Sequence, residues 1–118
     1  MRVLLVEDHA DTAEAIAHLL EKSGHAVTAV ATGHDAEQLC ESCPFDVMIC
    51  DIMLPDCEGW DLAGVCGKHG VPAIAFTAMG TESDIARSSS AGFVAHVVKP
   101  VEFEQLKEAL RRIPTRSR

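Results

Sequence analysis

Five short apolar runs alternate with five segments of helical periodicity along this chain. The apolar runs have the length of strands and cover residues 2–7, 26–31, 46–50, 72–76 and 94–98. The helical segments cover residues 10–24, 34–43, 59–70, 81–92 and 102–113. Near-continuous apolar strands that alternate with helices are typical of a parallel sheet with both faces covered. The predicted fold class is therefore α/β, a doubly wound five-stranded parallel sheet with helices on both faces.

The last two helical segments differ in how much apolar surface they carry. Residues 81–92 begin with Thr81 and Asp84, spaced as a capping box, but carry little apolar surface. Residues 102–113 carry an apolar stripe made of Phe103, Leu106, Leu110 and Ile113. We expect the first of these helices to be mobile, and the second is predicted to close the domain as an amphipathic helix. Residues 1–113 are predicted to form one domain, and residues 114–118 a tail or the start of a linker.

Composition limits the function classes. The chain has 118 residues, which is enough for one domain with a core, and a formal net charge of -8. Acidic charge argues against nonspecific contact with nucleic acid or an anionic membrane. No apolar run is long enough for a membrane span, so a cytoplasmic location is expected. The five cysteines are an odd number, and although Cys40 and Cys43 form a C-x-x-C, we expect reduced thiols.

Polar side chains stand where four of the five predicted strands end. Glu7 and Asp8 follow the first, Asp51 the third, Thr77 the fourth and Lys99 the fifth. In open α/β sheets ligands bind beyond the carboxyl ends of the strands. If the first and third strands are neighbours, three carboxylates, one hydroxyl and one ammonium group converge there.

Asp51 interrupts an apolar run, "VMICDIML", in which an unpaired carboxylate would be costly. Clustered carboxylates repel one another, and one would take up a proton unless a cation intervened. A hard divalent ion with oxygen ligands resolves the repulsion, and Mg²⁺, or Mn²⁺ in its place, is the predicted cofactor. Lys99 and Thr77 add a fixed positive charge and a hydrogen-bond donor. This combination suits an incoming phosphoryl group.

Four stretches together resemble a known family. They are "LLVEDH", "DVMICDIMLPDCEGWDL", "AFTA" and "AGFVAHVVKPV". In this order, from Val3 to about Ile113, they are similar to the CheY-like receiver domain of two-component response regulators. The resemblance implies the flavodoxin-like strand order 2-1-3-4-5. The last stretch looks more like receivers of hybrid sensor histidine kinases than those of transcription factors.

The resemblance also implies roles at the site. Asp51 would accept a phosphoryl group from the phosphohistidine of a histidine kinase or histidine phosphotransfer domain. Asp8 would bind the metal directly together with Asp51 and the backbone carbonyl of Met53, and Glu7 would act through water. The domain would phosphorylate and dephosphorylate itself but turn over no separate substrate. An output domain or partner would lie elsewhere.

Further roles follow from the same resemblance. Thr77 and Lys99 would contact the phosphoryl oxygens, and the bond between Lys99 and Pro100 would be cis. Gly59 matches the glycine that follows the phosphorylation loop. The family often places Tyr or Phe three residues before the lysine, as a switch residue that responds with the threonine. This chain has His96 there, so we expect its switch to be shallow.

Each residue alone has an ordinary explanation, and three other classes of protein would need different residues. Glu7 and Asp8 could cap a helix, Asp51 could sit in a turn, and His9 is interpreted as a loop residue. A haloacid-dehalogenase-like phosphatase would need an aspartate at position 53, where this chain has Met53. A flavodoxin-like cofactor binder would need a small-residue phosphate loop after the first strand, and "EDHADTAE" is acidic. A degenerate receiver that serves as an interaction module would lack a key residue.

Overall fold

The computed structural model describes residues 1–78, 80–99 and 102–113 of the chain. The five strands are β1 (Arg2–Val6), β2 (Ala26–Val30), β3 (Val47–Cys50), β4 (Ala73–Thr77) and β5 (Phe93–Val98). The five helices are α1 (Ala10–Lys22), α2 (Gly33–Ser42), α3 (Gly59–Lys68), α4 (Glu82–Ala91) and α5 (Phe103–Arg111). The predicted alternation is confirmed, and the boundaries shift by one or two residues at most ends. The predicted tail, 114–118, lies outside the described residues.

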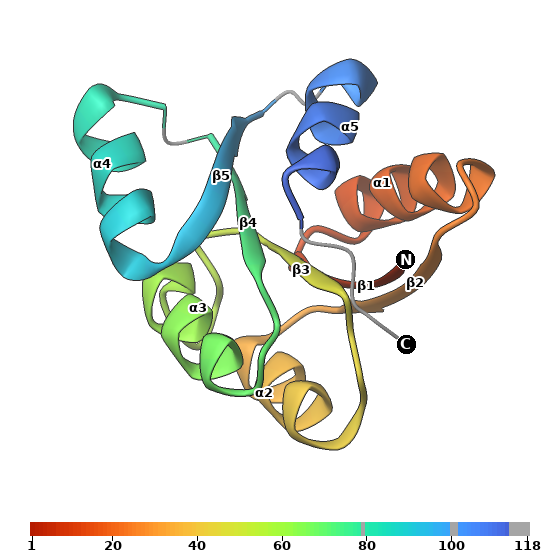
Figure 1. Ribbon diagram of the computed structural model, residues 1–118, viewed down its shortest axis with the longest axis horizontal. Helices are drawn as coiled ribbons and strands as arrows, with labels where there is room; N and C mark the ends of the chain where they lie inside the picture. The colour runs from red at the N-terminus through yellow and green to blue at the C-terminus, as the bar shows by residue number, and fades with distance from the viewer. Residues whose placement is uncertain (79, 100–101, 114–118) are drawn as a thin grey trace.

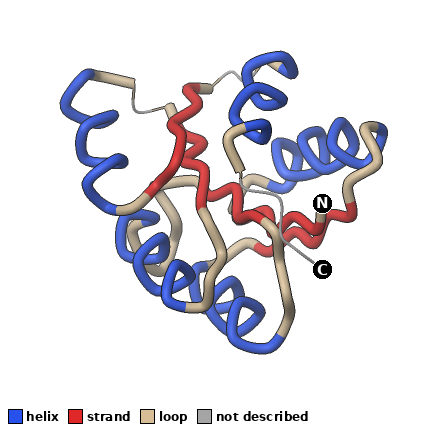
Figure 2. Tube along the Cα trace, viewed as in Figure 1, coloured by secondary structure: helices blue, strands red, loops and turns tan. Residues whose placement is uncertain are grey.

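The strands form one sheet in the order β2-β1-β3-β4-β5, and every neighbouring pair is parallel. β1 and β3 are therefore neighbours, with Val6 opposite Cys50 in the register. α1 and α5 lie on one face of the sheet and α2 and α3 on the other, with α4 beside β5 (Figures 1 and 2). The predicted doubly wound α/β fold is confirmed.

The alternation of side chains along the central strands divides the core into two layers. One layer, between the sheet and helices α1 and α5, contains aliphatic and phenyl side chains, among them Leu20, Phe76 and Leu106. The other, beneath α2 and α3, contains Leu4, Met48 and Trp60 together with three buried cysteines. The helices therefore hold the sheet from both sides and leave the carboxyl ends of its strands free for a site.

The two edge strands are less covered than the sequence predicts. In β2 no residue is buried, although the run Ala26–Val30 is largely apolar. In β5 only Phe93 and Val97 are buried, and Val94 and Val98 are exposed. An edge strand has a neighbour on one side only, so apolar composition there does not ensure burial.

α4 and α5 differ as predicted. α4 begins with the complete capping box of Thr81 and Asp84, and Ser88 is its only buried residue. α5 buries Leu106, Ala109 and Leu110 against the sheet. Within the described part of the chain, no helix has the length and apolar character needed to cross a membrane.

Candidate functional site

The carboxyl ends of β1 and β3 bring the predicted acidic residues together. β1 ends at Val6 and is followed by Glu7 and Asp8, and β3 ends at Cys50 and is followed by Asp51. The Asp51 amide donates to the Val6 carbonyl at 3.0 Å, so the ladder between the two strands extends to this residue. The convergence follows directly from the parallel pairing of β1 with β3.

Asp51 is buried and fixed by hydrogen bonds to both carboxylate oxygens. Its Oδ1 accepts from the Met53 amide at 3.1 Å, and its Oδ2 accepts from Lys99 Nζ at 2.9 Å. Only 5% of the residue is exposed. These two hydrogen bonds hold the carboxylate in one orientation, as a nucleophilic oxygen requires.

Gly59 fixes the loop that follows Asp51. Its amide donates to the Ile52 carbonyl at 2.7 Å, which starts α3 against the end of β3. A Cβ at this position would lie 2.7 Å from the Asp51 carbonyl oxygen and 2.7 Å from Ile52 Cα. Both are backbone atoms that cannot move aside easily, so only glycine allows this approach. The predicted importance of Gly59 therefore has a steric basis.

Lys99 connects the two strand ends. Its Nζ lies 3.1 Å from Glu7 Oε2 and 2.9 Å from Asp51 Oδ2, and it stands 4.7 Å from the centre of the Phe76 ring. Burial by itself would lower the pKa of Lys99. Its hydrogen bonds and charge contacts with Asp51 and Glu7 outweigh that effect, and the pKa of Lys99 is raised. The ammonium group therefore remains charged at neutral pH.

Glu7 holds its charge less easily. Its side chain is fully buried, and burial raises the pKa of Glu7. A hydrogen bond and charge repulsion with Asp51 raise it further, against the opposing effect of Lys99. One ammonium group therefore does not fully compensate the clustered carboxylates. This imbalance is what a bound divalent cation would relieve.

Four side chains of the cluster offer ligand atoms that lie close to one another. Ligand atoms of Glu7, Asp8, His9 and Asp51 all lie within 4.8 Å of one another. Carboxylate oxygens are the donors that Mg²⁺ prefers. The residues present therefore fit the predicted cation.

His9 is the member of this cluster that sequence reasoning missed. Its Nδ1 lies 3.0 Å from Glu7 Oε1 and 3.3 Å from Asp8 Oδ1, while most of its side chain stays exposed. It is the N-cap residue of α1, and its side chain makes no cap hydrogen bond. Its place next to Asp8 was the available signal. The interpretation of the acidic pair as simple helix caps also fails, because the N-cap is His9.

The remaining predicted residues are placed as follows. Thr77 ends β4 and is buried, and its carbonyl accepts from the Lys99 amide at 2.8 Å. Met53 is 67% exposed, and its backbone amide donates a hydrogen bond to Asp51 Oδ1. Pro100 lies outside the described residues, so the cis bond stays a prediction.

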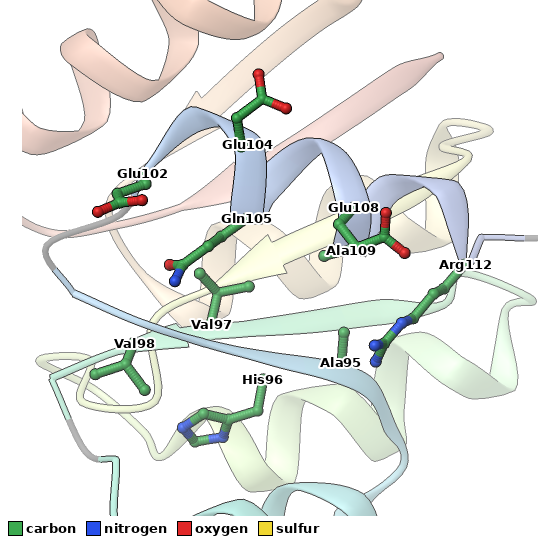
Figure 3. Close-up of a pocket in the computed structure, with 10 residues that line it drawn as sticks. All are labelled: Ala95, His96, Val97, Val98, Glu102, Glu104, Gln105, Glu108, Ala109 and Arg112. Carbon is green, nitrogen blue, oxygen red and sulfur yellow. The ribbon is translucent and has the colours of Figure 1, made fainter.

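His96 stands apart from the acidic cluster, in the middle of β5. It pairs with Ala75 of β4, and its Nδ1 lies 2.7 Å from the hydroxyl of the buried Ser88 on α4. A groove of about 510 Å³ runs between β5 and α5. Figure 3 shows Val97 pointing from β5 toward Gln105 of α5 and the His96 ring pointing the other way. The contact between His96 and Ser88 therefore links β5 to α4.

Comparison with known proteins identifies the family. The profile of the response regulator receiver domain matches residues 3–111. The probable transcriptional regulatory protein SilR of Salmonella typhimurium is 33% identical over 96% of this chain and 50% of its own length. The sensor histidine kinase AruS of Pseudomonas aeruginosa is 33% identical over 98% of this chain and 12% of its own. The chain thus spans about half the length of the first regulators that it matches.

Solved structures agree with the fold. The non-phosphorylated HemR receiver domain from Leptospira biflexa superposes with a TM-score of 0.86 and 30% identity, covering 99% of this chain and 98% of that one. The chemotaxis protein CheY4 of Vibrio cholerae superposes with a TM-score of 0.88 at 24% identity, covering 96% and 98%. The relatives that contain a matching region thus include both transcriptional regulators and a sensor kinase.

Proposed function

The chain belongs to the response regulator receiver domain family of two-component signal transduction, and from that premise we propose that Asp51 is its phosphoacceptor. The observation that carries this proposal is the geometry of Asp51, which is buried at the end of β3 with Lys99 Nζ at 2.9 Å from its Oδ2. A flavodoxin-like cofactor binder is not favoured, because acidic residues occupy the loop after β1 where such a protein would bind a phosphate.

The transfer that we propose uses groups that this chain holds at the ends of its strands. A carboxylate oxygen of Asp51 attacks the phosphorus of a phosphohistidine, a P–O bond forms, the P–N bond breaks, and the leaving imidazole keeps the nitrogen electron pair. Lys99 and Thr77 would hold oxygens of the transferred group, since both stand at neighbouring strand ends. Stabilisation of developing charge by such fixed groups is the main resource of phosphoryl transfer.

Asp8, Asp51, the Met53 carbonyl and, through water, Glu7 are the residues that would hold Mg²⁺. A bound Mg²⁺ would neutralise charge on the phosphoryl oxygens and on the carboxylates. Mn²⁺ has the same preference for oxygen ligands and could replace it. The acidic cluster supports this proposal through its donor atoms and through the raised pKa of Glu7.

The partner that fits this chemistry is the phosphohistidine of a histidine kinase or of a histidine phosphotransfer domain. The domain itself would catalyse only its own phosphorylation and dephosphorylation. We place its action in the cytoplasm, where such kinases have their phosphodonor domains, and assign output to another domain or protein. The net charge of -8 supports a protein partner over nucleic acid or membrane contact by this domain.

Acetyl phosphate labelling tests the proposal. With Mg²⁺, the wild-type protein should gain the mass of one phosphoryl group, about 80 Da. Asp51→Asn should gain none. Asp56→Asn is the matched control, because Asp56 belongs to the same loop and its oxygens accept from the Gly33 and His34 amides of α2. Full labelling of Asp51→Asn, or loss of labelling in both variants, would reject Asp51 as the phosphoacceptor.

A further inference from the structure

All five cysteines lie in one part of the fold, on α2, β3, α3 and the loops that join them. Two of them approach closely. The Sγ atoms of Cys40 on α2 and Cys66 on α3 are 2.8 Å apart. The C-x-x-C of the sequence is not the close pair, because Cys43 lies at the end of α2 with its Sγ 3.8 Å from the Ser42 hydroxyl. The spatial pair therefore spans 26 positions of sequence.

The surroundings of the pair favour a bond between the two sulfurs. Cys40 is 4% exposed and Cys66 is fully buried, inside the apolar layer beneath α2 and α3. The S–S bond of a disulfide is about 2.0 Å long, so the atoms need to approach by only about 0.8 Å from their 2.8 Å separation. The packing of α2 on α3 therefore already brings the two sulfurs into contact.

We propose that Cys40 and Cys66 form a dithiol that a hydroperoxide oxidises to a disulfide joining α2 to α3. The Cys40 thiolate attacks the peroxide, the O–O bond breaks, and a sulfenic acid forms with release of water or an alcohol. The Cys66 sulfur then attacks the sulfenic sulfur, an S–S bond forms, and a second water leaves. Two thiol protons and two electrons pass to one peroxide, which balances the reaction.

The order of the two steps follows from the environment of each thiol. The hydrogen-bonding contact between the Cys40 and Cys66 sulfurs lowers the pKa of Cys40. The same interaction raises the pKa of Cys66, which is also fully buried. Cys40 is thus the more acidic and the less buried of the two, so it is the attacking thiol and Cys66 the resolving one.

The disulfide would join the two helices between which the Asp51 loop is held. Asp56 of that loop accepts from the Gly33 and His34 amides at the start of α2, at 2.8 and 2.9 Å. The loop ends at Gly59, where α3 begins. This inference goes beyond phosphorylation and does not depend on it.

Proteolytic cleavage after glutamate residues separates Cys40 and Cys66 from each other and from the other three cysteines. Glu37, Glu41, Glu58 and Glu82 place Cys40 in fragment 38–41, Cys66 in fragment 59–82, and the other three cysteines in fragment 42–58. Native protein is treated with hydrogen peroxide, its free thiols are alkylated in denaturant, and the digest is examined by mass spectrometry. We expect a disulfide between fragments 38–41 and 59–82 that dithiothreitol removes. Absence of this link, or a dominant link from 38–41 to 42–58, would overturn the proposal.

Variants supply a second measurement on the intact protein. Peroxide should raise the melting temperature of the wild type by on the order of 10 °C, because the cross-link closes a loop in the unfolded chain. Cys43→Ser should behave like the wild type, and Cys66→Ser should show no rise. A rise that survives in Cys66→Ser, or that disappears in Cys43→Ser, would assign the effect to a different pair.

Discussion

The acidic cluster and the α4–β5 side of the molecule are built in opposite ways. At the cluster, Asp51 and Glu7 are buried and hydrogen-bonded. The backbone at Gly59 packs so closely on Asp51 that a Cβ there would lie 2.7 Å from the Asp51 carbonyl oxygen. On the other side, α4 buries Ser88 alone, and Ile85 of the same helix is 44% exposed. The site is therefore preformed, whereas the α4–β5 side is held by a few contacts.

Several contacts of α4 are polar, and those of Arg87 lie near solvent. Arg87 stands 4.8 Å over the Trp60 ring of α3 and bonds to Glu58 at 3.3 Å, and Ser88 meets His96 of β5 at 2.7 Å. Such contacts stabilise by about 1 kcal/mol or less each when exposed. This difference indicates that phosphorylation takes place in the rigid part of the molecule. The weakly held part is then the one that changes conformation in response.

The largest expected effect comes from adding a methyl group at the rigid site. Gly59→Ala should lower the free energy of unfolding by about 3 kcal/mol, because the new Cβ meets backbone atoms of Asp51 and Ile52. Gly80→Ala is the matched change on the α4 side, where the atoms nearest to an added Cβ belong to the exposed Val98 side chain, the first at 3.0 Å. It should cost less than about 1 kcal/mol. Urea unfolding of both variants gives the comparison.

Gly64→Ala is the control for the effect of replacing glycine by alanine where no steric conflict arises. Gly64 lies within α3, and no atom lies within 4 Å of the position of an added Cβ. This change should stabilise the protein by about 0.5–1 kcal/mol. Equal costs at positions 59 and 80 would contradict the view that the site is the rigid region.

Metal binding should act on the site with a somewhat smaller effect. Mg²⁺ at about 100 times its Kd should add about 2.7 kcal/mol to the free energy of unfolding, by linkage. Chelation should therefore lower the melting temperature of the wild type and change that of Asp8→Ala much less. Asp11→Ala, in the first turn of α1, is the control and should respond like the wild type. Equal responses of wild type and Asp8→Ala would exclude Asp8 as a ligand.

The raised pKa of Glu7 predicts a pH dependence in the absence of metal. The folded state holds the Glu7 proton more tightly than the unfolded state, whose pKa is near 4.5. The stability contributed by this group is thus fully present below about pH 4.5 and is lost as pH rises through the folded pKa. Glu7→Gln lacks this titration, so its stability relative to the wild type should increase with pH over that window. A difference that stays constant from pH 4 to 8 would contradict the raised pKa.

Most of the fold and much of the site were predictable from the sequence, for a physical reason. The period of apolar residues determines strands and helices, and parallel pairing places strand ends together, so Asp51, Asp8, Glu7 and Lys99 could be grouped in advance. Contacts that depend on side-chain direction could not. The approach of His9 to the carboxylates and that of Cys40 to Cys66 depend on which way each helix turns its side chains against its neighbours.

The smallest expected effect, and the sharpest test of the comparison, is the response of α4 to phosphorylation. NMR spectra recorded with and without a beryllofluoride mimic of the phosphoryl group should show shifts in residues 80–97, beyond those that touch Asp51. Residues 103–111 of α5 should move little, because Leu106 and Leu110 anchor that helix in the core.

We propose that Thr77 moves toward the mimic and that His96 follows, at the cost of its contact with Ser88. Imidazole is smaller and more polar than the usual ring, so the population shift should be shallow and should vary with pH. His96→Tyr should deepen the shift in residues 80–97. If only residues around Asp51 respond and His96→Tyr changes nothing, α4 is not the switch, and the domain would act by passing its phosphoryl group on.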